Sequence, residues 1–192
     1  MRKIDENKKE AITKAVFQLT KEIGLTGLSV AKVAKLAGVS PGTIYIYYKD
    51  KSDMLSQILM QVKDIMDDGM ETAILSADDI FDQLENFLIY LIDKWTKYPE
   101  HSLFMRTALE NTNEFGQEAL EYCAENAKPL VDLYNRLIAS GKVKAISQDL
   151  MVSWTAMSVA NMILLHYQRG TKLSDSEISQ MMELSIDAIR KR

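Results

Sequence analysis

The run of residues 29–51, SVAKVAKLAGVSPGTIYIYYKDK, constrains the fold of this chain more than any other segment. A short helix is expected over residues 30–36, and Gly38 supplies the tight turn that follows it. Ser40 caps a second short helix, with Pro41 at its first position, where the missing N–H is not needed. Two short helices joined by a glycine turn are typical of the helix-turn-helix motif, whose second helix enters the major groove of DNA.

The rest of the chain is also predicted to be helical, so the expected fold class is all-α. Eight Gly and three Pro are too few for a protein built from many β-turns. Residues 5–23 carry apolar side chains at helical spacing and end at Gly24. A long helix is expected over residues 51–74, and Pro129 should kink or break the helix over residues 114–140. The other expected helices cover residues 77–97, 99–111, 147–169 and 174–190.

Charge divides the chain into a basic head and an acidic body. Residues 1–51 hold ten Lys and Arg against five Asp and Glu, a net charge of +5. Residues 52–192 hold thirteen against twenty-two, a net charge of −9. The asymmetry favours contact of the head alone with a polyanion, although ordinary solvated charge is the alternative. The charge pattern therefore predicts that residues 1–51 form a head that binds DNA, and that residues 52–192 form a separate body.

Several features indicate a cytoplasmic protein. The single cysteine, Cys123, excludes an internal disulfide and fits a reducing compartment. Residues 2–10 are polar, so no secretion signal is visible there. The longest apolar stretch, residues 150–167, is interrupted by Ser, Thr, Asn and His, which favours a buried helix over a membrane span.

Catalysis finds no support in the residue pattern. The two histidines, His101 and His166, lie far apart in sequence and, with one cysteine, give no recognisable metal-ligand spacing. The acidic pairs at residues 67–68 and 78–79 are adjacent, so their side chains point apart on a helix. No phosphate-binding glycine loop is present. We expect no enzyme activity, no metal and no cofactor.

The segment that begins at residue 29 closely resembles the amino-terminal domain of the TetR (tetracycline-repressor-like) family. The family pattern resembles T-x-x-x-I-A-x-x-A-G-V-S-x-G-T-x-Y-x-H-F-x-x-K. The residues of this chain that match it are Ala34, Ala37, Gly38, Val39, Ser40, Gly42, Thr43, Tyr45 and Lys51. The chain departs from the pattern where Ser29 replaces Thr, and where Tyr47 and Tyr48 replace His-Phe. The resemblance implies an all-α homodimer whose two heads bind a palindromic operator in double-stranded DNA. It also implies a DNA-binding domain over residues 1–51 and a ligand-binding and dimerisation domain over residues 52–192.

The same segment supplies the candidates for DNA contact. Tyr45 resembles the phosphate-binding tyrosine of the family, and Lys51 is placed to hold a phosphate at a helix N-terminus. Thr43 is placed to hydrogen-bond a base or to touch a thymine methyl group, unless its hydroxyl only caps its own helix. The full set is Ser29, Ser40, Pro41, Gly42, Thr43, Tyr45, Tyr47, Lys49 and Lys51. Helix capping alone also explains the two serines.

The body is predicted to hold a pocket for a small-molecule effector that is largely apolar or aromatic. Eleven methionines suggest an adaptable interior. The candidate lining residues are Phe87, Tyr90, Trp95, Phe104, Tyr122, Cys123, Trp154, Met157, Asn161 and His166. Plain core packing is the alternative for each of them. The last two helices are the expected dimer surface, as a four-helix bundle across a two-fold axis.

These features together predict a one-component transcriptional regulator, a repressor that an effector releases from its operator. Two alternatives stay open for its regulation. The first is a regulator that binds DNA more tightly with its ligand, as an activator or with a co-repressor. The second is a DNA-binding protein without an effector. A helical enzyme or scaffold with an incidental helix-turn-helix is a third and weaker reading.

Overall fold

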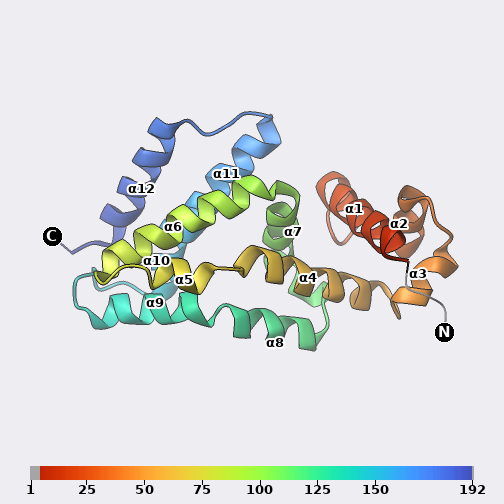
Figure 1. Ribbon diagram of the computed structural model, residues 1–192, viewed down its shortest axis with the longest axis horizontal. Helices are drawn as coiled ribbons and strands as arrows, with labels where there is room; N and C mark the ends of the chain where they lie inside the picture. The colour runs from red at the N-terminus through yellow and green to blue at the C-terminus, as the bar shows by residue number, and fades with distance from the viewer. Residues whose placement is uncertain (1–4, 192) are drawn as a thin grey trace. The chain divides into compact units, whose positions relative to one another are not determined.

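The structure is a computed structural model that describes residues 5–191, and over that range the expected all-α class is confirmed (Figure 1). Its α-helices are α1 (Glu6–Ile23), α2 (Val30–Ala37), α3 (Pro41–Tyr47), α4 (Lys51–Asp67), α5 (Met70–Ile74), α6 (Ile80–Lys97), α7 (Pro99–Glu110), α8 (Gln117–Asn126), α9 (Lys128–Ala139), α10 (Gln148–Val152), α11 (Ser158–Arg169) and α12 (Asp175–Ile189). A 3-10 turn, η1 (Thr112–Glu114), precedes α8, and a π-helical turn, η2 (Ser153–Met157), joins α10 to α11. Residues 1–4 of the predicted head lie outside the described range.

The single helix predicted over residues 51–74 is interrupted at residues 68–69, where the chain breaks between α4 and α5. Gly69 adopts a φ of +86°, in the left-handed region that ends a right-handed helix. Tyr90 of α6 supplies a hydrogen-bond donor at the break. Its hydroxyl lies 2.5 Å from the carbonyl oxygen of Met66 and 3.0 Å from that of Asp68. These carbonyls have lost their partners in the next helical turn. Burial raises the pKa of Tyr90, so its hydroxyl remains a hydrogen-bond donor.

The predicted effect of Pro129 is confirmed. The chain leaves α8 at Asn126 and restarts as α9 at Lys128, with the proline in the first turn. A proline is tolerated there because the first N–H groups of a helix have no intrahelical acceptor. The capping box predicted for the last helix is also present, since the Ser174 hydroxyl and the Glu177 carboxylate each accept from the other residue's N–H.

The described chain divides into two compact units, and we describe each by itself. The first contains residues 5–65 and 100–125, and the second contains residues 66–99 and 126–191. The first unit therefore places α7 and α8 with the three head helices and most of α4. This grouping differs from the predicted boundary after residue 51, and the functional division of the chain at that point stays a prediction.

An aromatic cluster forms part of the core of the first unit. The Phe104 ring of α7 is fully buried and lies 5.4 Å, centroid to centroid, from Phe17 of α1 and 6.3 Å from Phe115. His101 lies 4.8 Å from the same Phe17 ring. Burial lowers the pKa of His101, so the imidazole stays neutral at pH 7. The cluster ties α1 to α7 by edge and tilted ring contacts, which aromatic side chains prefer.

The core of the second unit contains a polar pair next to the π-helical turn. Tyr134 of α9 is fully buried, and its hydroxyl lies 2.5 Å from Oγ1 of Thr155, which is also fully buried. Thr155 donates to the Met151 carbonyl oxygen at 2.7 Å, so Tyr134 is the donor within the pair. Both buried hydroxyls are thereby satisfied, as the interior of a protein requires. Burial raises the pKa of Tyr134 to about 12.

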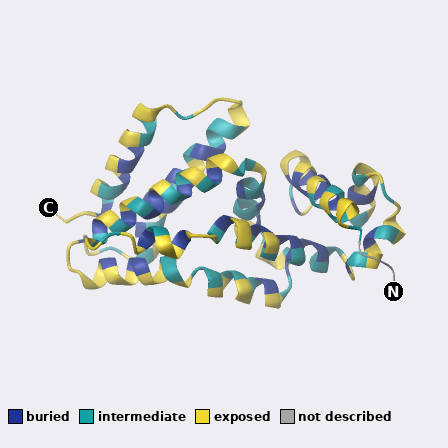
Figure 2. Ribbon diagram, in the orientation of Figure 1, coloured by how far each residue is buried: buried dark blue, intermediate teal, exposed yellow. Residues whose placement is uncertain are grey.

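The apolar helix of residues 148–169 is buried on one face only within this chain. Met151, Val159 and Ile163 are buried, whereas Leu150 is 43% and Trp154 58% exposed. The expectation of a buried helix therefore holds for one face only within the single chain. Figure 2 shows the same division into buried and exposed faces along most helices.

Length and composition alone would allow the helix of residues 148–169 to cross a membrane. Its most apolar window has a mean hydropathy of 1.2, and 39% of that window is buried inside the chain. One such helix is weak evidence, because core helices of soluble proteins pass the same test.

Candidate nucleic-acid interface

The turn between α2 and α3 has the geometry that the glycine predicts. Gly38 ends α2 in the left-handed conformation, with φ 69° and ψ 29°. The N–H of Val39 then reaches back to the Ala34 carbonyl oxygen at 3.0 Å and closes the end of the helix. A side chain at Gly38 would find space, because no atom lies within 4 Å of its Cβ position, but the left-handed backbone would be strained for any residue with a Cβ. The turn fixes the direction in which α3 leaves α2.

Two serines act as N-caps, as the sequence predicts. The Ser29 hydroxyl accepts from the Lys32 N–H at 3.3 Å, and the Ser40 hydroxyl accepts from the Thr43 N–H at 3.2 Å. The hydroxyls of Ser40 and Thr43 also lie 2.9 Å apart. Capping thus accounts for both serines in this structure. Thr43 must exchange or share its hydrogen bond with Ser40 before its hydroxyl can bind a base.

The third helix has one inward and one outward face. Ile44 is fully buried and Tyr48 is 3% exposed, so these two side chains anchor α3 to the core. Burial raises the pKa of Tyr48 to about 12. Tyr45 is 57% exposed, and Pro41 and Gly42 at the start of the helix are exposed as well. Because α3 is only seven residues long, its exposed side chains form a compact surface that a DNA groove can accept.

Tyr47 is only half-exposed and differs from Tyr45 in its surroundings. Its ring lies 6.4 Å from that of Tyr48, centroid to centroid, at a tilt of 59°. The ring is therefore partly committed to packing at the end of α3.

Ile46 is an apolar candidate that the sequence interpretation missed. Its side chain is 52% exposed on α3, between the two tyrosines. Two residues after a buried position on a helix, a side chain points to the opposite side, so the buried Ile44 was the signal that could have identified it. An exposed isoleucine on a recognition helix can contact the methyl group of thymine.

The start of α4 carries a cluster of alternating charges. Asp50 caps the helix by accepting from the Asp53 N–H at 2.9 Å, and Asp53 accepts from the Lys49 N–H at 2.7 Å. The Lys49 side chain is exposed. The Lys51 side chain, by contrast, forms an ion pair, because its Nζ lies 2.7 Å from Oε2 of Glu114 in η1. The residue predicted to hold a phosphate thus already binds a carboxylate.

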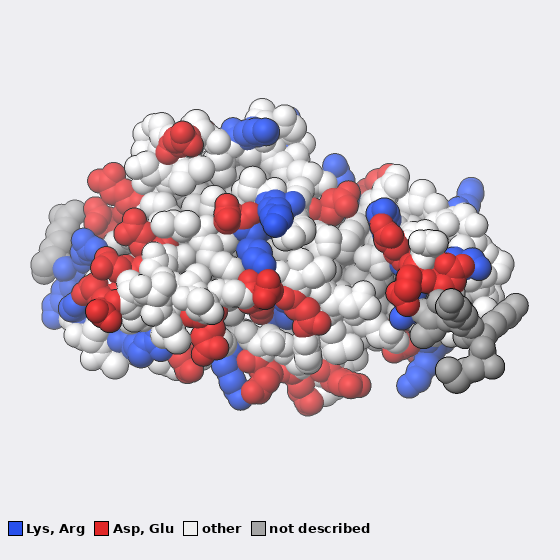
Figure 3. Space-filling view, in the orientation of Figure 1, with Lys and Arg blue, Asp and Glu red and all other residues white. Residues whose placement is uncertain are grey.

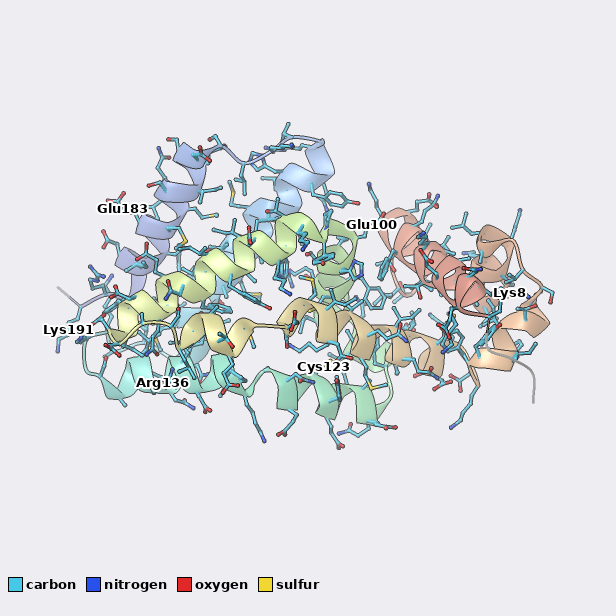
Figure 4. All side chains as sticks on the ribbon, in the orientation of Figure 1. Lys8, Glu100, Cys123, Arg136, Glu183 and Lys191 are labelled. Carbon is cyan, nitrogen blue, oxygen red and sulfur yellow. The ribbon has the colours of Figure 1, made fainter. Side chains whose placement is uncertain are left out.

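The ten candidates for the effector pocket are divided between the two units. Phe104, Tyr122 and Cys123 lie in the first, and the other seven lie in the second. Cys123 lies on α8 (Figure 4), and Tyr122 on the same helix is exposed and donates its hydroxyl to Asp64. Phe104 belongs to the aromatic cluster of the first unit. Core packing, the alternative named for each candidate, describes Phe104, whereas Tyr122 lies on the surface of the helix.

The candidates in the second unit fall into three groups. Phe87 and Trp95 are buried core residues of α6, and the Tyr90 hydroxyl donates to a carbonyl oxygen at the end of α4. Trp154 and Asn161 are exposed, so the expectation that they line the interior of the body is wrong for the single chain. Two candidates are half-buried: Met157 and His166. The His166 ring lies 3.0 Å from the Thr171 hydroxyl and 3.7 Å from a Glu177 oxygen, so neighbouring residues supply its polar partners.

Acidic side chains dominate one part of the surface of the first unit. On the face drawn in Figure 3, they gather over α8. Among residues 5–191, no group of three or more His, Cys, Asp or Glu residues is arranged to hold a metal ion.

Comparison with known proteins connects this geometry to a family. The model of the bacterial regulatory proteins of the tetR family matches residues 12–58. The chain is similar to an uncharacterised HTH-type transcriptional regulator of Haemophilus influenzae, with 35% identity over 95 residues. It is also similar to the HTH-type transcriptional regulator AcrR of Shigella flexneri, with 25% identity over 154 residues.

These alignments cover different shares of the two relatives. The first covers 50% of this chain and 47% of the Haemophilus protein, so the chain spans about half the length of that relative. The second covers 78% of this chain and 71% of AcrR. Among solved structures, a TetR family transcription regulator from Marinobacter aquaeolei aligns over 100% of both chains with a TM-score of 0.82 and 24% identity. This last similarity shows that the two chains share their fold.

Proposed function

Because the chain belongs to the TetR family of transcriptional regulators, we propose that it binds a palindromic operator as a homodimer and represses transcription. One observation carries the DNA-binding part of this proposal. The seven-residue helix α3 is anchored by Ile44 and Tyr48, which leaves Tyr45 57% exposed on its outer face. A short helix held by its inner side chains and rich in exposed side chains at its start suits the DNA major groove.

The candidate residues fall into those that contact DNA phosphates and those that contact base edges. Tyr45 and Lys51 hold phosphates, with support from Ser29, Ser40 and Lys49, and these contacts position the head without reading sequence. Thr43, Tyr47 and Ile46 are left to meet base edges. Pro41 and Gly42 let the start of α3 approach the DNA closely, because neither carries a long side chain.

Exposed apolar side chains on the last helices support the homodimer. Leu150 and Trp154 lie on the helix of residues 148–169, and Leu184, which is 70% exposed, lies on α12. A patch formed by several such side chains on neighbouring helices is typical of a surface that another protein covers. A second copy of the same helices would bury them in a four-helix bundle and would place two heads on a two-fold operator.

An apolar effector is the proposed signal for release from DNA. The second unit combines buried aromatic side chains such as Phe87 and Trp95 with one buried hydroxyl pair, Tyr134 and Thr155. Such an interior suits a ligand that is mostly apolar and carries one polar group. The ligand would act by binding the DNA-free conformation more tightly than the DNA-bound one, since only this difference can shift the equilibrium. The proposed regulator acts in the cytoplasm and has no catalytic activity.

Selection from random DNA tests the operator proposal. We expect the purified chain to enrich duplexes that carry an inverted repeat, with half-sites one or more helical turns apart. Analytical ultracentrifugation of the complex should give two chains for each duplex. Enrichment of a single, non-repeated site, or of no sequence at all, would contradict the proposal of a dimeric operator-binding protein.

A ligand screen tests the proposed effector. We expect lipophilic compounds, such as long-chain acids and fused-ring alcohols, to raise the melting temperature of the chain, because a ligand that binds only the folded state stabilises it. The same compounds should weaken binding to the selected operator. Tighter operator binding with the ligand would instead support co-repression or activation, and a screen without any stabilising compound would support a DNA-binding protein that has no apolar effector.

A further inference from the structure

The segment between α7 and α9 is strongly acidic and lies beside the start of α4. Residues 107–127 contain five glutamates and no lysine or arginine. One of the five, Glu114 in η1, has its Oε2 2.7 Å from the Nζ of Lys51. The two side chains are only 18% and 27% exposed, so the pair is largely withdrawn from water.

The backbone on the far side of Glu114 is held by two contacts. Phe115 is 7% exposed and packs edge-on against Phe104, with 6.3 Å between the ring centroids. The N–H of Gly116 donates to the hydroxyl of Ser56 on α4 at 2.8 Å. Because these contacts already order the segment, little conformational entropy is lost when the Glu114 carboxylate meets Lys51. The pair is therefore better defined than an ion pair between two flexible surface side chains.

We propose that Glu114 occupies the phosphate-binding position of Lys51 when DNA is absent, and that it thereby lowers the affinity of the head for DNA. The inference rests on the proposed function, in which Lys51 holds a phosphate. A carboxylate and a phosphate both offer anionic oxygens to the same ammonium group. A phosphate that approaches Lys51 must displace this carboxylate or accept its repulsion, and either course weakens DNA binding.

The exchange has a signature in the salt dependence of binding. Neutralising a DNA phosphate releases its condensed counterions, with a slope of about −0.9 in log K against log salt for each phosphate. When a DNA phosphate displaces Glu114 from Lys51, the freed carboxylate attracts a cation from solution. This uptake cancels part of the counterion release from the DNA. Removing the Glu114 charge should therefore steepen the slope by up to about 0.9 for each head, or about 1.8 for a dimer.

The pair also gives the body a direct route to the DNA contacts. Glu114 lies in the turn between α7 and α8, whereas Lys51 begins the helix that follows the recognition helix. Any displacement of residues 112–116 along α4 would change the distance between the two charges. The phosphate-binding strength of Lys51 would then follow the position of this turn.

The test is the substitution Glu114→Gln, measured by fluorescence anisotropy with a labelled random-sequence duplex over a series of salt concentrations. A random sequence suffices, because phosphate contacts do not depend on sequence. The variant should bind about three- to tenfold more tightly than the native chain and should show the steeper salt slope. Glu118→Gln on α8 is the matched control: it removes the same charge from the same segment, and its affinity should stay within about twofold of the native value.

The double variant Lys51→Ala with Glu114→Gln completes the design. If Glu114 acts through Lys51, its substitution should have no further effect once Lys51 is absent. An equal gain in both backgrounds would overturn the inference, as would unchanged or weaker binding by Glu114→Gln. If Lys51→Ala weakens binding while Glu114→Gln does not strengthen it, the inference alone fails. Absence of DNA binding by the native chain would overturn the proposed function itself.

Discussion

Replacing Tyr45 and Lys51 together by alanine should weaken operator binding by about 100- to 1000-fold. Each residue is proposed to bind one phosphate in each head, which gives four contacts in a dimer. A phosphate contact worth about 1 kcal/mol would bring the total to about 4 kcal/mol. The lower limit allows for the carboxylate of Glu114, which already occupies Lys51 in the free chain at 2.7 Å. Anisotropy or mobility shift with the selected operator measures the loss.

Two further variants separate the contributions in this experiment. Tyr45→Phe keeps the ring and removes only the hydroxyl, so it should weaken operator binding less than Tyr45→Ala does. Lys172→Ala removes a positive charge from an exposed position in the second unit, and its operator affinity should stay close to the native value. Native affinity in the Tyr45→Ala and Lys51→Ala double variant would show that these residues are not the DNA contacts, and would return the helix-turn-helix to an incidental feature.

Replacing Phe104 by alanine should lower the free energy of unfolding by about 3–5 kcal/mol. The Phe104 ring is fully buried and packs against Phe17 of α1 and against Phe115. Its removal leaves a cavity at the point where α1, α7 and the turn after η1 meet. Urea denaturation followed by circular dichroism measures the change, and the denaturant slope shows whether unfolding remains a single transition.

A substitution on the opposite face of the same helix is the control for Phe104→Ala. Leu109 of α7 is 57% exposed, so Leu109→Ala should change the stability by less than about 1 kcal/mol. Equal losses for the two variants would show that the Phe104 ring is not packed as described. A small loss for Phe104→Ala would also revive the expectation that this ring lines an open effector pocket.

The head is the part of the fold that the sequence predicted most closely. The helices expected over residues 5–23 and 30–36 are found at Glu6–Ile23 and Val30–Ala37. Ser40 and Pro41 likewise mark the start of α3. These bounds were predictable because a capping hydroxyl binds an N–H three residues away, and a glycine turn needs only its own backbone freedom.

The body shows where local patterns are insufficient. Apolar residues continue at helical spacing from Met54 to Met66, and the pattern alone predicts one helix to residue 74. The helix ends earlier, at the left-handed Gly69, and the hydroxyl of Tyr90, about twenty positions further along the chain, donates to the carbonyl oxygens of Met66 and Asp68 beside the break. Trp154 shows the same limit for burial: its helical position indicates an apolar face, but not whether this chain or a second copy covers it.

The sequence by itself determined the helical fold class and the helix-turn-helix, with caps at Ser29 and Ser40 and a turn at Gly38. These features depend on contacts between residues at most five positions apart, which a reader of the chain can count. The tertiary structure alone decided which charged and polar groups meet across long separations. It paired Lys51 with Glu114 and Tyr134 with Thr155, and it grouped α7 and α8 with the head. Such pairings depend on how whole helices pack, because a carboxylate or a hydroxyl carries no local sign of the partner that packing will bring to it.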